Sequence, residues 1–594
     1  MTAGPAQDGT AAAALPPAFL GVEHSLTGRR WTGPGAEEDR RAAAMARDTG
    51  LAEPVARILL RAGVPPAEAP GYLSPRLRDL LPDPHSLRDM QPAAGRLLDA
   101  LRRKEAIAVF ADYDVDGGAS AALLLTWLRQ MGHDAALYVP DRIDEGYGPN
   151  PAAMAQLARA HRLILCVDCG TLAHEALAAA RGADVVVLDH HLGAETLPPA
   201  LAVVNPNRQD ESGDLGHLCA AAVVFLFLVE ANRQLRASGR GSVPDLMGML
   251  DLVALATVAD VAPLTGVNRA FVRQGLAVMA RRERPGLVAL ADVARLDRAP
   301  APYHLGYVFG PRVNAGGRIG RADLGARLLA TADASEAARL AAELERLNEE
   351  RRAVEAAVRD AALAQAESRA GGPLAWAAGE GWHPGVVGIV AARLKEAMGR
   401  PAVVIGLQDG IGKGSARSVP GVDIGAAVQR LAAEGLIERG GGHRMAAGLT
   451  VARSRLEPAM DRLAALLARQ GAGAAVPSLR IDGLLMPSAA VAELVEALDA
   501  AGPFGAGAPA PRFVLPDVAI RSARRIGSAH LRLRVDDGSG ASCDAIAFGA
   551  FDSALGPALE GHAGRRFHLA GRIEIDHWQG RRRVQLRLDD AAPA

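Results

Sequence analysis

The stretch Ile107-Ala108-Val109-Phe110-Ala111-Asp112-Tyr113-Asp114-Val115-Asp116-Gly117-Gly118 decides the fold of this chain. Its five apolar residues predict a buried strand, and its two glycines lead into an apolar stretch that predicts a helix over 119–131. Short β-rich runs then alternate with helical stretches up to residue 204. Those runs cover 135–139, 163–167, 185–188 and 201–204. Because strand and helix alternate strictly, we predict a doubly wound parallel sheet of the α/β class.

Ionisable side chains follow the ends of these predicted strands. Three carboxylates follow the first strand, one follows the strand over 163–167, and an Asp-His-His sequence follows the strand over 185–188. A further acid ends a later apolar run. These residues are Asp112, Asp114, Asp116, Asp168, Asp189, His190, His191 and Asp260. Since the carboxyl ends of parallel strands meet at one edge of a sheet, we expect the groups that follow strands to converge there.

Convergence of so many carboxylates favours a metal site. Without cations they would repel one another by several kcal/mol, or some would stay protonated. An oxygen-rich set with an imidazole suits Mn²⁺ or Mg²⁺ better than Zn²⁺, and a carboxylate shared by two ions would hold them roughly 3.5–4 Å apart for in-line phosphoryl displacement. Taken singly, Asp112 also fits a helix cap, and Asp189-His190-His191 also fits a polar turn.

The remaining sequence divides into further regions. Prolines break residues 1–105 into a leader and an N-terminal helical region, and the α/β pattern with its following helices covers 106–330. A connecting helix over 331–371 precedes a second, smaller α/β domain over 372–472. About five short strands with Gly and Asp at the turns predict a small β-barrel over 475–594.

The connecting helix carries two clear signals. Asp333 and Glu336 resemble a capping box at its start. Apolar residues then recur on a heptad-like stripe amid Glu and Arg, which favours a helix with one packed face over a membrane-binding or calmodulin-binding helix. The stripe consists of Leu340, Leu344, Leu347, Val354 and Val358.

Composition limits the class of protein. The net charge of −1 gives no global attraction to nucleic acid, so a polyanion site requires local arginine clusters. Four scattered cysteines are too few for a disulfide framework and indicate a reducing compartment. For Cys166 and Cys169, packing at a strand end is favoured over zinc or redox chemistry. The start of the chain is a poor signal peptide and the apolar run 219–229 is too short for a bilayer, so we predict a cytoplasmic protein with no membrane segment.

The motifs at the predicted strand ends resemble those of a known superfamily. Residues 112–117, 167–170, 189–191 and 257–260 resemble, in order and spacing, the four motifs of the DHH phosphoesterases, and within them the RecJ family of single-strand-specific exonucleases. The similarity runs from about Trp31 to the end. It includes residues 140–148, 311–318, 382–388, 414–418, 440–448 and 502–509. Alanine stands where glycine is usual at Ala111, Ala220, Ala222 and Ala256.

The resemblance implies roles at a metal centre with two Mn²⁺ or Mg²⁺ ions. Asp168 would bridge the ions, Asp112 would lie beside them as a further metal-site residue, and His191 would contact the phosphate. The full set of implied ligands is Asp114, Asp116, Asp168, His190 and Asp260. Asp189 is expected to orient the histidines.

Substrate contacts are expected from loops outside the metal motifs. A loop arginine such as Arg142 can hold a phosphate bidentately, with a surface salt bridge as the alternative, and the glycine run 440–442 can present backbone N–H groups to an anion. A tyrosine at 147 would stack on a base or pack locally. With the resemblance, the expected contacts are Arg142, Tyr147, Arg312, Asn314, Arg318, Ser415, Arg417, Ser418, Gly441, Gly442 and His443.

The C-terminal barrel looks like an OB-fold, a common platform for single-stranded nucleic acid. Trp578 with the arginines 581–583 is the first candidate patch, and His530, Arg532 and Arg534 on one strand are the second. Phe548 and Phe567 stand in apolar strand contexts, so we predict that both are core residues.

The residues themselves support metal-dependent phosphoester hydrolysis. The resemblance implies more: 5′-to-3′ hydrolysis of single-stranded DNA to 5′-mononucleotides in DNA repair and recombination, with single-strand-binding protein and a RecQ-like helicase as partners. Two alternatives stay open at this point. One is a phosphodiesterase for short oligonucleotides or cyclic dinucleotides, and the other is a non-catalytic single-strand-binding scaffold.

Overall fold

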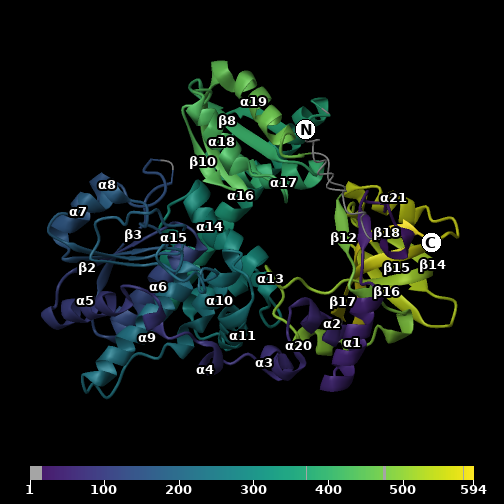
Figure 1. Cartoon of the computed structure of the whole chain (residues 1–594), viewed down its shortest axis with the longest axis horizontal. Helices are drawn as coiled ribbons and strands as arrows, with labels where there is room; N and C mark the ends of the chain where they lie inside the picture. The colour runs from purple at the N-terminus through teal and green to yellow at the C-terminus, as the bar shows by residue number, and fades with distance from the viewer. Residues whose placement is uncertain (1–16, 143, 370, 473–476, 579–580) are drawn as a thin grey trace, which may run out of the picture. The chain divides into compact units, whose positions relative to one another are not determined.

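A computed structural model describes residues 17–142, 144–369, 371–472, 477–578 and 581–594 of the chain (Figure 1). Residues 1–16, most of the predicted leader that extends to about Leu20, lie outside them. The contacts divide the chain into two compact units: Met1–Ser74, Val476–Gly502 and Ala510–Ala594 form one, and Pro75–Ala475 with Pro503–Pro509 form the other. Within the described residues, no helix is both long enough and apolar enough to span a membrane.

The larger unit contains the predicted doubly wound sheet. Its five strands are all parallel, in the order β3-β2-β4-β5-β6. They are β2 (Ile107–Ala111), β3 (Ala135–Tyr138), β4 (Leu163–Val167), β5 (Asp184–Leu188) and β6 (Ala202–Val204). The chain leaves β2 for β3 on one side and then crosses to β4 on the other, so a topological switch point lies between β2 and β4. This is the place where open α/β sheets bind ligands.

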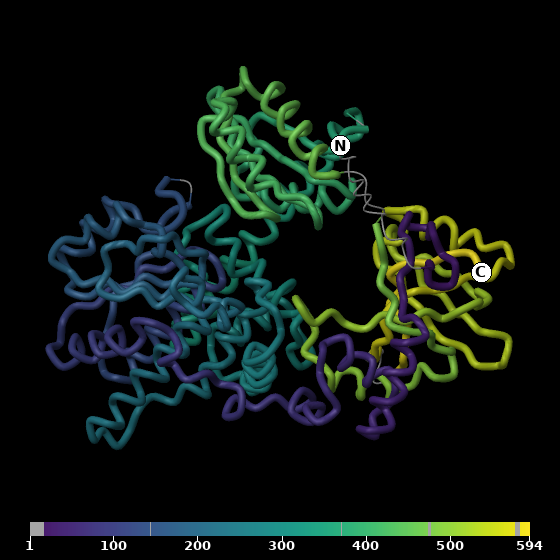
Figure 2. The backbone as a smooth tube through the Cα atoms, viewed as in Figure 1, coloured from purple at the N-terminus to yellow at the C-terminus, as the bar shows by residue number. Residues whose placement is uncertain are grey.

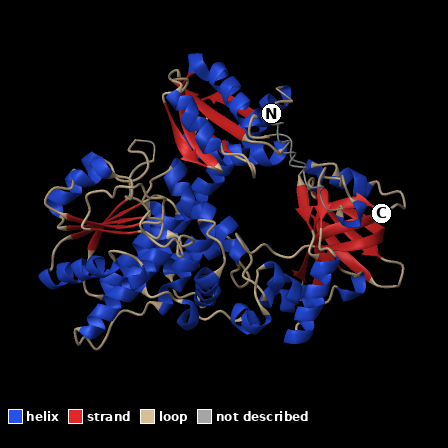
Figure 3. Cartoon of the chain, in the orientation of Figure 1, coloured by secondary structure: helices blue, strands red, loops and turns tan. Residues whose placement is uncertain are grey.

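Helices cover both faces of this sheet (Figure 3). Val109 and Leu165 face the core shared with α5, α6 and α9, whereas Phe110 and Cys166 face the core shared with α7 and α8. Alternate strand residues therefore serve the two cores, as the period of two requires. These helices are α5 (Met90–Arg103), α6 (Val115–Gln130), α7 (Pro151–Ala160), α8 (His174–Ala178) and α9 (Ala220–Ala237).

A helical region follows the sheet, with α10 (Leu250–Ala259) buried in the main core. The next elements are α11 (Gly266–Met279), α12 (Pro285–Val293), α13 (Pro302–His304), the π-helical η5 (Leu305–Phe309), α14 (Gly310–Ile319) and α15 (Leu324–Ala330). The predicted connecting helix is α16 (Ala334–Ser368), and its residues Leu340, Leu344 and Leu347 are buried.

Only half of the expected capping box forms at the start of α16. The Asp333 carboxylate accepts a hydrogen bond from the Glu336 backbone N–H at 2.8 Å. The Glu336 carboxylate instead accepts from Arg327 and Thr331, both at 2.7 Å. The Glu336 carboxylate thus binds the side chains of Arg327 and Thr331 and not the backbone N–H group that a complete capping box would give it.

The second α/β domain of the larger unit has a mixed sheet, in the order β10-β11-β9-β8-β7, with only β7 and β8 parallel. The glycine run 440–442 lies in its edge strand, β10. The elements are β7 (Ala375–Glu380), α17 (Pro384–Met398), β8 (Ala402–Gln408), β9 (Ile411–Arg417), α18 (Ile424–Ala433), β10 (Arg439–His443), β11 (Ala446–Ala452) and α19 (Leu456–Ala468).

The smaller unit is built on a barrel of five long strands. The order β14-β15-β16-β18-β17 closes because β17 also pairs with β14. This closure confirms the predicted barrel. Its elements are α20 (Ala492–Ala500), β14 (Phe513–Ile526), β15 (His530–Asp536), β16 (Ser542–Ala547), α21 (Leu555–Glu560), β17 (Arg566–Trp578) and β18 (Arg581–Pro593).

The described residues before 106 divide between the two units. β1 (Arg30–Thr32) pairs in parallel with β12 (Ser478–Arg480), and the buried Trp31 indole donates a 2.9 Å hydrogen bond to Asp590. With α1 (Ala36–Thr49) and α2 (Glu53–Arg61), this part belongs to the barrel unit. The later part, which contains α5, belongs to the sheet unit, because the apolar face of α5 packs on the sheet.

The aromatic residues of the barrel differ from the prediction in one case. Phe567 is buried, as expected, but Phe548 is 51% exposed. It lies just beyond β16, with the His530 ring edge-on at 5.3 Å and the Arg587 guanidinium 5.3 Å from its ring. Phe548 is therefore a surface residue, because the strand that was expected to bury it ends one residue earlier.

The two predicted basic patches on the barrel differ in their contacts. The side chains of Trp578 and Arg581 lie outside the described residues, and Arg582 forms an ion pair with Glu496. Arg532 and Arg534 share one acid, Asp544, at 3.6 and 2.9 Å.

Candidate active site

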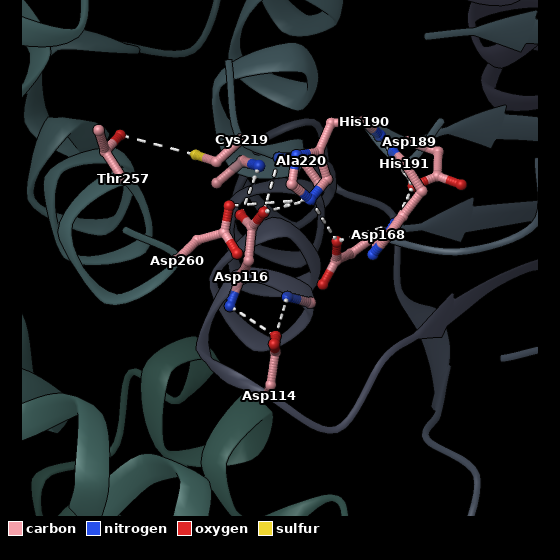
Figure 4. A network of polar contacts seen from close by, with 12 residues as sticks. Asp114, Asp116, Asp168, Asp189, His190, His191, Cys219, Ala220, Thr257 and Asp260 are labelled. Carbon is pink, nitrogen blue, oxygen red and sulfur yellow. Dashed lines mark hydrogen bonds and ion pairs between the residues drawn. The ribbon is translucent and has the colours of Figure 1, made fainter. Parts of the chain in front are cut away.

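The predicted metal residues gather at the switch point between β2 and β4 (Figure 4). Asp114 caps α6: its Oδ1 accepts hydrogen bonds from the Asp116 and Gly117 backbone N–H groups at 2.9 and 3.1 Å. A Cβ on Gly117 would lie 2.4 Å from the Asp112 carbonyl oxygen, so this tight turn requires glycine. The residue that caps α6 is Asp114 and not Asp112. Asp112 and Asp116 therefore take no part in this cap.

Asp116 is held by the start of another helix. Its two carboxylate oxygens accept hydrogen bonds from the Ala220 and Ala221 N–H groups, at 2.7 and 2.8 Å, at the N-terminus of α9. The partial positive charge of a helix N-terminus stabilises a carboxylate there. Since both donors are backbone groups, alanine at 220 in place of the usual glycine leaves this contact intact.

His190 lies at the centre of the acidic residues. Its Nε2 is 3.3 Å from Asp168 Oδ1, 3.7 Å from Asp116 Oδ2 and 3.8 Å from Asp260 Oδ2 (Figure 4). Asp168 itself is 2% exposed and has a positive φ of 59°, a conformation that costs free energy for a non-glycine residue. The sheet edge thus holds this carboxylate in place despite local strain.

The carboxylates of this cluster are costly to ionise without a cation. Burial, followed by the charges of neighbouring acids, raises the pKa of Asp112 and Asp168 well above the usual range and that of Asp260 to about 8. Burial likewise raises the pKa of Asp116. Two buried oxygens, Asp112 Oδ1 and Asp168 Oδ1, accept no hydrogen bond from the described residues.

Divalent cations fit this arrangement. Three overlapping triads place one potential ligand atom from each member within 4.8 Å of the others: Asp168 with His190 and His191, Asp116 with His190 and Asp260, and Asp112 with Asp114 and Asp168. Asp168 and His190 each belong to two triads. A donor set made mostly of carboxylate oxygens suits Mn²⁺ or Mg²⁺.

Asp189 has a different environment from the other acids. It accepts hydrogen bonds from the His190 and His191 backbone N–H groups, from His191 Nδ1 at 2.8 Å and from the Thr171 N–H at 3.1 Å. Burial alone would raise the pKa of Asp189, but the bonds from His191 and Thr171 hold it below its usual range. Asp189 therefore orients the histidines and has little capacity left for a metal.

The surroundings of His191 favour its protonated form. Burial lowers its pKa, but Asp189 outweighs that effect and raises the pKa to about 9. The Tyr147 hydroxyl, on a 54% exposed side chain, lies 3.1 Å from His191 Nε2 and donates to the Asp168 carbonyl at 3.1 Å. An imidazolium at this partly exposed position can contact an anionic phosphate.

The sequence analysis missed two residues that hold the histidine backbone. Asn205 donates from its amide to the His191 carbonyl at 2.8 Å, and Asn207 donates to the His190 carbonyl at 2.6 Å. The available signal was their position: Asn205-Pro206-Asn207 follows β6 directly, at the same sheet edge as the acids.

Several of the predicted substrate residues line one cleft of about 730 Å³ between the sheet domain and the second α/β domain, all within the larger unit. They are Arg142, Arg318, Ser415, Arg417 and Gly442, and the sequence analysis missed Lys413 and Gly388 in the same lining. A Cβ on Gly442 would lie 2.4 Å from the Ala446 carbonyl oxygen, so only glycine fits there.

The arginines of the cleft repel one another. Burial and then the charge of Arg142 lower the pKa of Arg318 to about 10 and also lower the pKa of Arg417. Arg142 lies 5.3 Å from the centre of the ring of Tyr113, which stands between Asp112 and Asp114. A group of partly buried cations beside the acidic cluster favours a bound anion such as phosphate.

Other predicted substrate residues do not line this cleft. Arg312 is engaged with Glu345 and with the Val308 carbonyl at 2.8 Å, and the Ser418 hydroxyl donates to the Val422 carbonyl at 2.7 Å. Asn314 Oδ1 is buried without a hydrogen-bond partner among the described residues. Gly441 and His443 lie in the edge strand β10.

The buried thiols of Cys166 and Cys169 take no part in the site. Burial raises the pKa of both, and Cys169 Sγ donates to the Val167 carbonyl at 3.3 Å. The preferred packing role agrees with these contacts.

Comparison with family models identifies the class. Residues 106–257 match the DHH family, N-terminal domain, residues 371–469 match the DHHA1 domain, and residues 481–590 match the RecJ OB domain. A parallel sheet with acids and an imidazole at its switch point, followed by these two domains, defines a DHH-class protein.

Relatives of known name narrow the class to one family. The chain is 37% identical to the single-stranded-DNA-specific exonuclease RecJ of Dickeya dadantii, over 87% of this chain and 92% of that protein. It is 36% identical to the enzyme of the same name from Escherichia coli, over 85% and 91%. The crystal structure of RecJ in complex with Mn²⁺ from Thermus thermophilus matches with a TM-score of 0.78 and 30% identity, covering 94% of this chain and 79% of that one. A Mg²⁺ complex of RecJ from the same organism matches with a TM-score of 0.73. This chain belongs to the RecJ family.

Proposed function

We propose that this chain is a metal-dependent exonuclease that hydrolyses single-stranded DNA from the 5′ end and releases 5′-mononucleotides. The observation that carries the proposal is the position of Arg142. Its guanidinium lines the cationic cleft and also lies over Tyr113, between two acids of the candidate metal centre. A terminal 5′ phosphate in the cleft would therefore leave the next phosphodiester near Asp168 and His190.

The metal centre would use the acids and the imidazole at the switch point. Asp114, Asp116, Asp168, His190 and Asp260 would hold two Mn²⁺ or Mg²⁺ ions, with Asp168 shared and Asp112 beside them; the unpaired buried oxygens and the raised pKa values support this set. When bound, the ions would activate a water and neutralise charge on the leaving 3′ oxygen.

The surrounding side chains would position the substrate phosphate. Asp189 holds the His191 ring through the 2.8 Å hydrogen bond, and the partly exposed imidazolium would contact the phosphate. Tyr147 links His191 to the Asp168 backbone and limits the movement of both. No covalent intermediate with the protein is required, because water is the nucleophile.

The 5′ end would be held by the cleft. Arg142, Arg318 and Arg417 supply planar donors, Ser415 supplies a hydroxyl, and Gly442 lets a backbone approach closely. Tyr147 would contact a base or the nearest sugar. Arg312, Asn314, Ser418, Gly441 and His443 stay predictions, and the ion pair of Arg312 and the backbone bond of Ser418 favour positioning roles for those two.

The domains would divide the work. We assign catalysis to residues 106–330, the 5′-end cleft jointly to these and to 372–472, the joining helix to 331–371, and strand binding to the barrel over 475–594. On the barrel, His530, Phe548 and Arg587 form an exposed aromatic and cationic group of the kind that stacks on bases.

The biological setting is proposed on the same basis. A single-stranded substrate is produced by unwinding and is covered by single-strand-binding protein in the cell, which supports a RecQ-like helicase and that protein as partners in repair and recombination. The four cysteines are buried and unpaired, which supports a cytoplasmic location.

A product time course tests the proposal. DNA labelled at the 5′ or the 3′ end, single- or double-stranded, is incubated with the protein and Mn²⁺, Mg²⁺ or a chelator. We expect 5′-labelled single strands to release labelled mononucleotide first, and chelator to stop the reaction. Mononucleotide released first from the 3′ end would contradict the polarity. Binding without any release would favour the scaffold, and cleavage confined to dinucleotides would favour the short-oligonucleotide enzyme.

A further inference from the structure

The segment Pro503–Pro509, which we call the clasp, belongs to a different unit from its neighbours in sequence. Residues Val476–Gly502 and Ala510–Ala594 belong to the barrel unit, whereas Pro503–Pro509 belongs to the sheet unit, which otherwise ends at Ala475. In Figure 2 it is the yellow-green turn that lies against the teal part of the tube. The function proposed above assigns no role to the clasp, although its sequence is one of the stretches shared with the RecJ family.

The clasp packs on the turn that follows Asp260. The Leu264 N–H donates to the Ala506 carbonyl at 2.8 Å, and the buried Arg269 donates to the Pro503 carbonyl at 3.3 Å. The clasp itself is a tight turn, because Gly505 and Ala508 exchange backbone hydrogen bonds of 2.9 and 3.2 Å.

Two glycines allow this close approach. A Cβ on Gly505 would lie 2.8 Å from Leu264 Cδ1, which is inside any real contact distance. Gly507 has a φ of +67°, and a Cβ there would lie 3.0 Å from Pro263 Cβ. The glycines of the clasp are therefore explained by the turn 261–264 and not only by local chain flexibility.

The turn needs external support because its backbone is strained. Val261 has a φ of 60° directly after the metal-site residue Asp260, and it is 69% exposed. The Val261 and Ala262 N–H groups close the end of α10 on the Val258 and Thr257 carbonyls, a helix ending that normally places glycine in the left-handed position. A β-branched residue in that conformation persists only where the surroundings fix it.

A second contact extends the support to Asp116. The buried Asn268 amide donates to the Pro263 carbonyl at 3.0 Å and to the His217 carbonyl at 2.9 Å. His217 precedes by three residues the Ala220 N–H that binds the Asp116 carboxylate. The turn held by the clasp is thus tied, through one amide group, to the loop that fixes a second acid of the centre.

We propose that the clasp is a positioning element of the metal centre: it holds the turn 261–264 so that the Asp260 carboxylate stays close to Asp116 and His190. The inference rests on the proposed metal centre. The chain runs into the barrel unit from both ends of the clasp.

The test is a change at Gly505 in the full-length protein. The variant Gly505→Val places two methyl groups where Leu264 lies, and Gly241→Val, at a glycine with open space around it in the same unit, is the matched control. Mn²⁺ affinity is measured by electron paramagnetic resonance of free Mn²⁺, without DNA. We expect Gly505→Val to bind Mn²⁺ about 10-fold more weakly, as when residues that orient metal ligands are lost, and saturating Mn²⁺ to restore most of kcat. Gly241→Val should match the wild type.

Two further comparisons separate the possible causes. A packing role alone would lower the melting temperature of Gly505→Val and leave Mn²⁺ affinity unchanged, and that outcome would overturn the proposal. If Gly505→Val does not fold, as judged by circular dichroism, Gly505→Ala is measured instead, with the same expected direction and criterion. Asp260→Asn serves as the reference: if it too binds Mn²⁺ normally, the assignment of Asp260 to the metal centre is at fault, and the clasp has no ligand to position.

Discussion

His190 Nε2 lies 3.3 Å from Asp168 Oδ1, an oxygen that accepts no hydrogen bond from any described residue. The imidazole is close enough to share a cation with this carboxylate, yet it does not satisfy the carboxylate as a donor would. When no metal is bound, the buried Asp168 carboxylate is therefore costly to ionise. We therefore expect the Asp168 side chain to couple the stability of the protein to metal binding.

The variant Asp168→Asn tests this coupling. A carboxyl group whose pKa is raised by folding favours the unfolded chain at every pH above its usual pKa, so the neutral amide should raise the melting temperature of the metal-free protein at pH 7. The same variant should lose the increase in melting temperature that Mn²⁺ gives the wild type, and exonuclease activity should fall by about 10³-fold or more.

The control for Asp168→Asn is Asp210→Asn, at a carboxyl group near the surface whose pKa is lowered by Arg208. It should slightly lower the melting temperature and leave the effect of Mn²⁺ intact. An Asp168→Asn protein that is still stabilised by Mn²⁺ would exclude Asp168 as the shared ligand.

The cluster of acids and histidines at the sheet edge could be predicted because its sequence pattern is local. Each of β2, β4 and β5 is a short apolar run with its polar residue directly after it, and parallel strands bring such positions together whatever the helices between them do. The same logic fails for Asn205 and Asn207. They follow a strand of only three residues, and an asparagine before proline reads equally well as an ordinary turn.

Arg417→Ala tests the cleft as the binding site for the 5′ end. Arg417 is half-buried beside Ser415, and loss of its guanidinium should raise KM for 5′-phosphorylated single strands about 10- to 100-fold, as expected for a charge-assisted hydrogen bond to phosphate. KM for the same strands with a 5′ hydroxyl should change little. Kinetics on the two substrates give the comparison, and Arg346→Ala, on the exposed side of α16, serves as the control. An equal rise in KM for both substrates would show that Arg417 does not bind the 5′ phosphate.

Long-range pairing set the limit of prediction in the barrel unit. The strand β14 was not expected because Pro516 and Asp517 interrupt its apolar pattern, and the structure absorbs them in a register shift between Leu515 and Val518. The pairing of β1 with β12 joins residues more than 400 positions apart, and no local pattern in three residues indicates such a partner. Arg312 was likewise assigned to phosphate because its ion-pair partner, Glu345, lies 33 residues away on another helix.

Phe548→Ala tests the exposed aromatic group of the barrel. Stacking of a base on an aromatic side chain contributes about 1–3 kcal/mol, so the affinity for a long single strand should fall about 5- to 150-fold. Cleavage of oligonucleotides too short to reach the barrel should be unchanged. Fluorescence anisotropy with labelled strands measures the affinity, and Ile526→Ala, an exposed apolar residue of the same unit, is the control. Unchanged affinity in Phe548→Ala would remove this group from the binding surface.

Trp31→Ala tests whether the N-terminal strand is part of the barrel unit. The indole is fully buried among Leu479, Ile481 and Val514 and donates to the buried Asp590, so its loss leaves both a cavity and an unpaired acceptor. We expect a loss of about 3–5 kcal/mol in the stability of the barrel unit. In thermal unfolding this should appear as an earlier transition with lost single-strand binding, while Mn²⁺ still stabilises the later transition of the sheet unit. Trp127→Phe is the comparison in the sheet unit, where the indole donates to Asn232. This variant should lower the temperature of the later transition, that of the sheet unit, and leave the transition of the barrel unit unchanged. If Trp31→Ala shifted only the transition that responds to Mn²⁺, the N-terminal strand would belong with the sheet and the division of the chain into these two units would fail.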